Sequence, residues 1–268
     1  MWEVVQEPFF QMALLNALLT GCLCGYLGVF VVLKRVVFVS VALSQMAALG
    51  VAVGFFMGIY PRVSAMAFTM LGIILLAMPY SEKNTSRESI LGYIYAMAAV
   101  TAVVLIAKNP IGEAHGLDLV CGNVLYTTQK DLIMLIVIVL AVVVLHLFYF
   151  KEFIFVSFDR DTAQTTGIKP GVFEFLLYIS FGLIISVSMQ TSGVMFIFAS
   201  LVIPAMIGLC VARHIFRVFF SAVVSAAVCV TAGFYVSYVC DLPSSSTIVL
   251  FYGVLFLSVK GITFLAKK

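Results

Sequence analysis

Residues 9–35 read FFQMALLNALLTGCLCGYLGVFVVLKR, an apolar run that ends in two basic residues. Residues 9–33 contain no Asp, Glu, Lys or Arg. An α-helix needs about 20 predominantly apolar residues to cross the hydrocarbon core of a bilayer. This stretch therefore predicts a membrane-spanning helix, and Lys34 and Arg35 mark the membrane face at which it ends.

The composition of the whole chain indicates the same class of protein. Of its 268 residues, 63% are hydrophobic and 10% are charged, and the mean hydropathy is +1.19. Soluble domains have about 45–50% apolar and about 25% charged residues, so this composition excludes one. The alternation typical of a β-barrel is missing, and a net charge of +3 is too small and too scattered for a nucleic-acid surface. We predict an all-α, polytopic membrane protein with a single transmembrane domain over residues 1–268.

Polar breaks divide the chain into nine apolar segments, each interpreted as one membrane crossing. The second and third segments are separated only by Ile59–Arg62, which predicts a tight turn. The longest break, Lys108–Lys130, has room for a short re-entrant or interfacial helix. The predicted segments cover approximately residues 9–33, 36–59, 63–80, 90–107, 131–150, 172–190, 193–212, 216–240 and 246–264.

The Lys and Arg residues in the breaks predict the orientation, because such residues gather on the cytoplasmic side of a membrane. Only Arg62, Lys108 and Lys130 fall on the opposite face. The N-terminus is therefore predicted outside and the C-terminus in the cytoplasm. The basic residues of the predicted cytoplasmic face are Lys34, Arg35, Lys83, Arg87, Lys151, Arg160, Lys169, Arg213, Arg217, Lys260, Lys267 and Lys268.

The predicted segments carry no charged residue near their centres, where a charge costs about 2.5 kcal/mol or more. Glu174 lies at the start of the sixth segment and can reach the cytoplasmic interface, and His146 in the fifth is expected to pack against its neighbours. The HExxH and GxxxxGK[ST] motifs of metalloproteases and phosphate loops do not occur. We therefore expect a passive or externally powered pathway without catalytic residues, not an enzyme.

Small and mildly polar side chains inside the segments are expected chiefly to let helices pack closely and bond to one another. The glycines of this kind are Gly21, Gly25, Gly28, Gly50 and Gly54. The polar residues are Gln11, Asn16, Ser40, Ser44, Gln45, Thr101, Ser186, Ser188 and Ser200.

The stretch before the sixth segment, residues 157–168, predicts a short helix at the cytoplasmic face. Asp159, Ala163 and Gly167 recur every four residues and would form one stripe on it. Asp159 suits the positive end of the helix dipole, Gly167 suits the C-terminal cap, and Lys169-Pro170 stops the helix. Such a stripe either enters a groove on a partner or belongs to an ordinary interfacial connector.

Several short motifs occur in one order from Phe10 to Lys260. Gly25–Arg35 (GYLGVFVVLKR) leads them, and together they resemble the permease subunits of the ABC importers for zinc, manganese and iron. The other motifs are Ala42-Leu-Ser44, Gly50–Gly54, Glu88–Gly92, Gly122–Leu125, Ser192-Gly193, Ser200–Ala205, Asp241–Ser244 and Thr247–Leu250.

The resemblance implies a multi-pass subunit of the bacterial cytoplasmic membrane that moves Zn²⁺ or Mn²⁺ by ATP-driven alternating access. It implies that Asp159, Ala163 and Gly167 belong to a coupling helix that docks on a cytoplasmic ATPase. The implied partners are two ATPase copies, a second permease copy (identical or paralogous) and an extracytoplasmic substrate-binding protein. ATP and Mg²⁺ would be bound by the ATPase, and no cofactor by this chain.

Two positions, four residues apart, depart from the family. Its members typically carry an Asp and, four residues later, a His on the second helix as metal ligands of the translocation path. Alignment on Ala42-Leu-Ser44 puts Val41 and Gln45 at these places. Residues at i and i+4 share a helix face, so Val41 and Gln45 would face the same way, without a metal ligand set of the family's kind. Ser44 lies next to Gln45 midway along the segment, and all three residues are predicted to line the path.

The departure leaves alternatives open. The same scaffold could carry a chelate or another small solute, and a standalone carrier or channel would need no ATPase. Replacement ligands could come from soft donors, although Cys22 and Cys24 point about 200° apart on a helix and Met46 is on another segment. Oxygen and nitrogen donors in the outer loop could also receive a cation; they are Glu113, His115 and Asp118.

Overall fold

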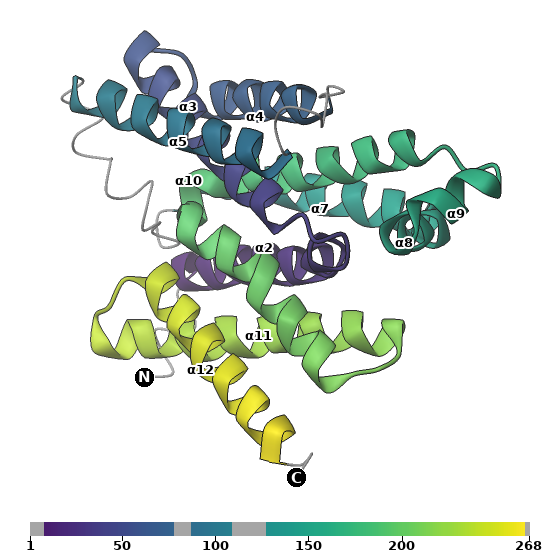
Figure 1. The fold of residues 1–268 in the computed structure, drawn as a ribbon. Helices are drawn as coiled ribbons and strands as arrows, with labels where there is room; N and C mark the ends of the chain where they lie inside the picture. Colours follow the sequence, from purple (N-terminus) through teal and green to yellow (C-terminus); the bar gives the residue numbers. More distant parts are fainter. Residues whose placement is uncertain (1–7, 78–86, 109–126, 266–268) are drawn as a thin grey trace. The chain divides into compact units, whose positions relative to one another are not determined.

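The computed structural model describes residues 8–77, 87–108 and 127–265. All the regular structure in these ranges is helical, which confirms the all-α class (Figure 1). The helices are α2 (Pro8–Leu33), α3 (Val37–Met57), α4 (Pro61–Ala77), α5 (Arg87–Ala107), α7 (Gln129–Phe148), α8 (Phe150–Phe158), α9 (Arg160–Thr165), α10 (Pro170–Val211), α11 (Ile215–Cys240) and α12 (Ser244–Leu265).

Seven helices in the described ranges are long and apolar enough to cross a membrane, and α4 is a shorter apolar helix. With 42 residues, α10 is about twice as long as a bilayer crossing requires. Its backbone leaves the helical conformation at Gly193, with φ 74° and ψ 163°, and this break separates the predicted sixth and seventh segments. The count of nine crossings and the orientation of the termini stay predictions.

The predicted turn between the second and third segments is confirmed. Gly58 ends α3 in the left-handed conformation, with φ 68°. The backbone N–H of Ile59 donates to the carbonyl of Gly54 at 3.0 Å, which satisfies a free carbonyl of the last turn. Pro61 then starts α4, where its fixed φ suits the first helical position and its missing N–H is not needed.

The described helices cluster into two compact units. One contains α2, the start of α7, the second part of α10, α11 and α12. The other contains α3, α4, α5, the rest of α7, α8, α9 and the first part of α10. The single transmembrane domain over residues 1–268 stays a prediction, and the 108–130 helix falls largely outside the described residues.

In the unit that contains α2, glycines bring helix backbones into contact. A Cβ at Gly28 would overlap the carbonyl oxygen of Leu201 on α10. A Cβ at Gly21 would lie 2.8 Å from Val230 Cγ2, and one at Gly25 would lie 3.2 Å from the Cβ of Ala226, both on α11. Lipid is as apolar as the helices, so close packing rather than the hydrophobic effect holds them together.

The unit that contains α3 uses glycine in the same way. A Cβ at Gly50 would lie 2.5 Å from the carbonyl oxygen of Ser64 on α4, and one at Gly54 would overlap the Ser64 hydroxyl. The first part of α10 approaches α4 at Gly182, where a Cβ would lie 2.5 Å from Ile73 Cδ1. The prediction that the glycines form close-packing faces is confirmed.

The contact between Gly28 and Leu201 makes a prediction. Gly28→Ala should lower the stability of the protein by about 1–3 kcal/mol, because overpacking forces the two backbones apart. Gly253→Ala is the matched control, since nothing lies within 4 Å of a Cβ at this helical position. Thermal unfolding in detergent would measure both. Equal midpoints for the two variants would contradict the described packing.

Candidate functional sites on α9 and α3

Asp159 caps the N-terminus of α9. Its Oδ1 accepts hydrogen bonds from the backbone N–H groups of Asp161 and Thr162, both at 3.1 Å, and its Oδ2 accepts one from the Thr162 hydroxyl. The hydrogen bonds from Thr162 lower the pKa of the exposed Asp159 carboxyl below its ordinary value. The predicted role of Asp159 at the start of this helix is confirmed, with the start at Arg160.

Gly167 ends the same helix in the left-handed region, with φ 88°. The N–H of Ile168 donates to the carbonyl of Ala163 at 3.1 Å, and the N–H of Gly167 donates to that of Gln164 at 3.2 Å. This is the pattern of a glycine-terminated helix, as predicted. The predicted range of 157–168 is too long, because residues 157 and 158 belong to α8.

Ala163 does not face an open surface. Its side chain is fully buried in the chain, whereas Asp159 and Gly167 are exposed. The expectation that Asp159, Ala163 and Gly167 form one stripe for a partner is therefore wrong for Ala163, whose side chain packs α9 against its own chain. The open side of α9 carries Gln164, which lines a shallow hollow of about 480 Å³ together with Gly167, Ile168, Lys169, Pro170, Gly171 and Val172.

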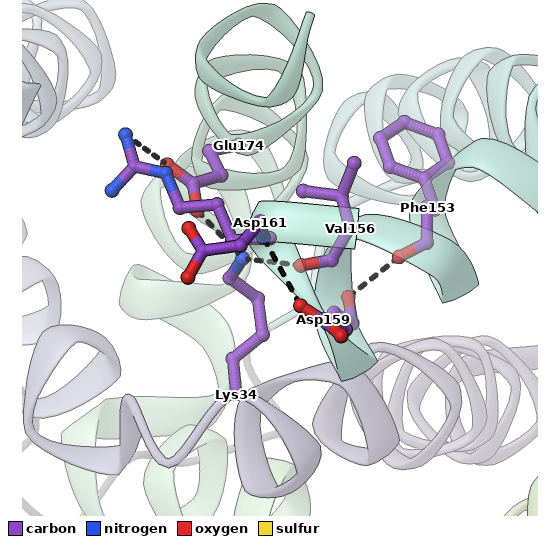
Figure 2. A network of polar contacts seen from close by, with 8 residues as sticks. Lys34, Phe153, Val156, Asp159, Asp161 and Glu174 are labelled. Carbon is purple, nitrogen blue, oxygen red and sulfur yellow. Dashed lines mark hydrogen bonds and ion pairs between the residues drawn. The ribbon is translucent and has the colours of Figure 1, made fainter. Parts of the chain in front are cut away.

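A mostly buried ion pair lies beside α9 (Figure 2). Lys34 Nζ donates to Glu174 Oε1 at 2.9 Å and to the backbone carbonyl of Val156 at 3.3 Å. The side chains of Lys34 and Glu174 are only 8% and 15% exposed. Arg160, the first residue of α9, lies 3.9 Å from Glu174 Oε2 and is largely exposed. The sequence placed Lys34 and Glu174 at the same membrane face without pairing them.

The residues predicted to line a path lie on different sides of α3. Val41 and Gln45 are half-buried and share a face, as their i, i+4 spacing requires. Ser44 is fully buried, and its hydroxyl donates to the carbonyl of Ser40 one turn earlier at 2.8 Å. Val41 and Gln45 thus lie together on a partly accessible stripe of α3, whereas the Ser44 side chain is buried among its neighbours.

Other predicted polar residues take part in helix packing. Asn16 Nδ2 on α2 donates to Thr191 Oγ1 on α10 at 3.2 Å, next to the break at Gly193. His146 is buried, lies 3.3 Å from the Ser180 hydroxyl through Nε2 and stacks on the ring of Phe153. The packing role predicted for His146 is confirmed.

Cys22 and Cys24, two of the candidate replacement ligands, differ in exposure. Cys24 is buried and Cys22 is half-buried, in line with their different directions on α2. Within the described ranges, no three His, Cys, Asp or Glu side chains come together. The outer-loop donors Glu113, His115 and Asp118 and the motif Gly122–Leu125 lie outside these ranges.

The cap of α9 makes a second prediction. Asp159→Ala should speed hydrogen exchange several-fold at the amides of Asp161 and Thr162, because both lose their acceptor. The cap stays intact above the ordinary carboxyl pKa of about 3.9 and is lost only as the pH falls through the lowered folded-state pKa. Asp159→Asn, which keeps an acceptor oxygen, is the control for exchange measured near pH 7. Equal protection in the Ala and Asn variants would show that this cap does not order α9.

The comparisons with known proteins agree over nearly the whole chain. The profile of the ABC 3 transport family matches residues 6–262. The manganese transport system membrane protein MntC of Listeria innocua is 26% identical over 273 residues, covering 99% of this chain and 96% of that protein. The manganese import system permease protein ScaB of Streptococcus parasanguinis is 27% identical over 254 residues, covering 94% of this chain and 90% of that protein.

A solved structure has the same fold. PsaBC from Streptococcus pneumoniae, in complex with Fab, superposes with a TM-score of 0.87 at 23% identity, covering 96% of this chain and 93% of that chain. The chain belongs to the ABC 3 transport family and is a multi-pass protein of the bacterial cytoplasmic membrane.

Proposed function

We propose that this chain is the membrane-spanning permease subunit of an ABC importer that moves a divalent transition metal, with Mn²⁺ as the favoured cargo. The family match over residues 6–262 carries the proposal. The relatives MntC and ScaB, matched over nearly their whole lengths, are named for manganese transport or import. Metal affinity would reside mainly in the substrate-binding protein, and the permease would conduct.

The donors on α3 favour Mn²⁺ over Zn²⁺. The half-buried stripe of Val41 and Gln45 offers one side-chain amide oxygen and no sulfur or imidazole nitrogen. Neutral oxygen donors and water suit Mn²⁺, whereas Zn²⁺ is more often held by imidazole and thiolate. A single neutral oxygen binds weakly, which suits a path that must release its cargo.

Helix α9 is proposed to receive the ATPase. Its ends are fixed by Asp159 and Gly167, and its inner side is fixed by the buried Ala163, so the helix can transmit force as a unit. The exposed side at Gln164 and the hollow beside it would be the docking surface. Closure of two ATPases would push on α9 and switch the path between its inward- and outward-facing states.

The assembly follows from the same proposal. Two permease copies would line one path across a symmetric interface, each docked to one ATPase copy. ATP and Mg²⁺ would be bound by the ATPase, so this chain would not be an enzyme. A substrate-binding protein would deliver the metal to the outer face.

A second cargo class is favoured by one observation. Val41 and Gln45 replace the Asp and His that the family resemblance leads us to expect, and the change removes a charge and an imidazole ligand from α3. A chelated metal or an uncharged solute would need hydrogen bonds, which the Gln45 amide can supply, rather than direct metal ligands.

ATPase stimulation of the purified permease–ATPase complex separates these cargo classes. The complex would be assayed with its binding protein loaded with Mn²⁺, with Zn²⁺ or with no metal. We expect stimulation by the Mn²⁺ form above the other two. No response to either metal would contradict a free-ion cargo and would favour chelates. A permease that transports without a nucleotide-binding partner would instead be a standalone carrier or channel.

The position of α3 makes a third prediction. Val41→Asp combined with Gln45→His should raise the affinity of the purified permease for Mn²⁺ and Zn²⁺ about tenfold or more, because the two side chains share an accessible face. Val41→Ala with Gln45→Ala is the matched control and should bind no better than the parent protein. Equilibrium dialysis would measure both. No gain with the Asp/His pair would contradict the placement of Val41 and Gln45 on one face of the path.

The docking surface of α9 makes a fourth prediction. Gln164→Trp should fill the hollow beside α9 and lower both co-purification of the ATPase and its cargo-stimulated activity, about tenfold for a change of about 1.4 kcal/mol. Gln164→Ala shortens the side chain at the same exposed place and should retain both. Gly167→Trp is a weaker test because the φ of 88° at Gly167 strains any side chain there. Unchanged stimulation in Gln164→Trp would count against α9 as the coupling helix.

A further inference from the structure

The buried ion pair joins parts of one unit that are far apart in the sequence. Lys34 belongs to the turn between α2 and α3, and Glu174 lies in the first turns of α10. The second acceptor of Lys34 is the carbonyl of Val156 in α8, two residues before that helix ends. One ammonium group therefore connects the turn between α2 and α3, the segment that leads into α9, and the first turns of α10; Figure 2 shows Lys34 between Val156 and Glu174.

The connection from Lys34 to α3 is short and stiff. Only residues 34–36 separate α2 from α3. Within this turn Arg35 has a φ of 56°, a left-handed conformation that a side chain rarely adopts. A residue keeps such a conformation only when its surroundings hold it there. A displacement of the Lys34 ammonium would therefore reach Val37, the first residue of α3, through a short and strained connection.

The connection from Glu174 to α9 is equally direct. Arg160 begins α9 and lies 3.9 Å from the second carboxylate oxygen of Glu174. Val156, whose carbonyl accepts from Lys34, is three residues before the Asp159 cap. Both routes end at the N-terminal end of α9, the helix proposed to receive the ATPase.

We propose that the Lys34–Glu174 pair is the positioning contact through which movement of α9 is transmitted to α3 and its Gln45 stripe. The proposal rests on the function proposed above. Separating the two charges would leave the mostly buried Lys34 without its carboxylate and Glu174 with only the longer contact to the exposed Arg160, so we expect the elements that carry them to move together. The neighbouring ring contacts of Phe153 with His146 and Phe173 are stacked and edge-on, respectively, and neither is an ion pair.

The decisive variant replaces both charges with apolar side chains, Lys34→Met with Glu174→Met. Replacing a buried pair by apolar residues of similar size is often neutral for stability, so the permease should fold and assemble with its ATPase. We expect ATP hydrolysis to continue while the Mn²⁺ transported per ATP falls about tenfold, a typical size for coupling between two sites. Lys34→Arg keeps the charge and the donors, and should keep the transport ratio.

A charge-reversed pair supplies a second variant if the Met pair does not fold. Lys34→Glu alone should lose coupling by like-charge repulsion. Lys34→Glu with Glu174→Lys should recover part of it, because the pair is restored while the bond to Val156 is lost and Arg160 then faces a like charge. Arg160→Gln removes the longer, exposed contact and should change the ratio much less.

Transport, hydrolysis and thermal stability would be measured on the same reconstituted complex. The inference would be overturned if the folded Lys34→Met, Glu174→Met variant transported as much Mn²⁺ per ATP hydrolysed as the parent complex. A loss of stability that fully accounts for the loss of transport would overturn it as well. The failure of the proposed function looks different: the unmodified complex itself would then show no ATP-driven Mn²⁺ uptake.

Discussion

Inside a bilayer the hydrophobic effect does not drive helices together, so their association depends on close packing and on polar contacts. Within the described ranges, helix contacts form where a glycine lets two backbones meet, as at Gly28 and Leu201, or where buried polar groups pair, as at Asn16 and Thr191. Each polar pair would be costly to separate in an apolar surrounding. The same holds for the charged Lys34–Glu174 pair, which lies where α9 joins the rest of its unit.

Much of the fold could be predicted from the sequence because long apolar runs leave few alternatives. The ends of α2, α3 and α11 agree with the predicted segments within a few residues. The local signals at Asp159 and Gly167 were sufficient for α9, since capping depends on neighbours in the chain rather than on tertiary structure. The sequence motifs resembled permeases of metal-type ABC importers, and the relatives named for manganese transport or import are membrane proteins of that class.

The rest depended on contacts between residues far apart in the sequence. Lys34 and Glu174 are 140 positions apart, and no periodicity pairs them. The sequence indicated only that Glu174, at the start of an apolar segment, and the basic Lys34 lie at the same membrane face. Ala163 was assigned to an open stripe by its spacing and Ser44 to the path by its place midway along the second segment, but both side chains are buried. The break inside α10 falls at Gly193, whose φ of 74° and ψ of 163° leave the helical region, and the apolar pattern alone placed a segment boundary there without predicting this backbone conformation.

The central proposal is that Mn²⁺ crosses this permease only when an ATPase acts on it. The most direct test is Mn²⁺ accumulation in vesicles that contain the reconstituted permease–ATPase complex, with the binding protein on the outer side and ATP on the ATPase side. We expect the Mn²⁺ concentration inside to rise above that outside with ATP, and to show no rise with a hydrolysis-deficient ATPase. Downhill entry of Mn²⁺ without ATP, or steady ATP hydrolysis without accumulation, would contradict the account.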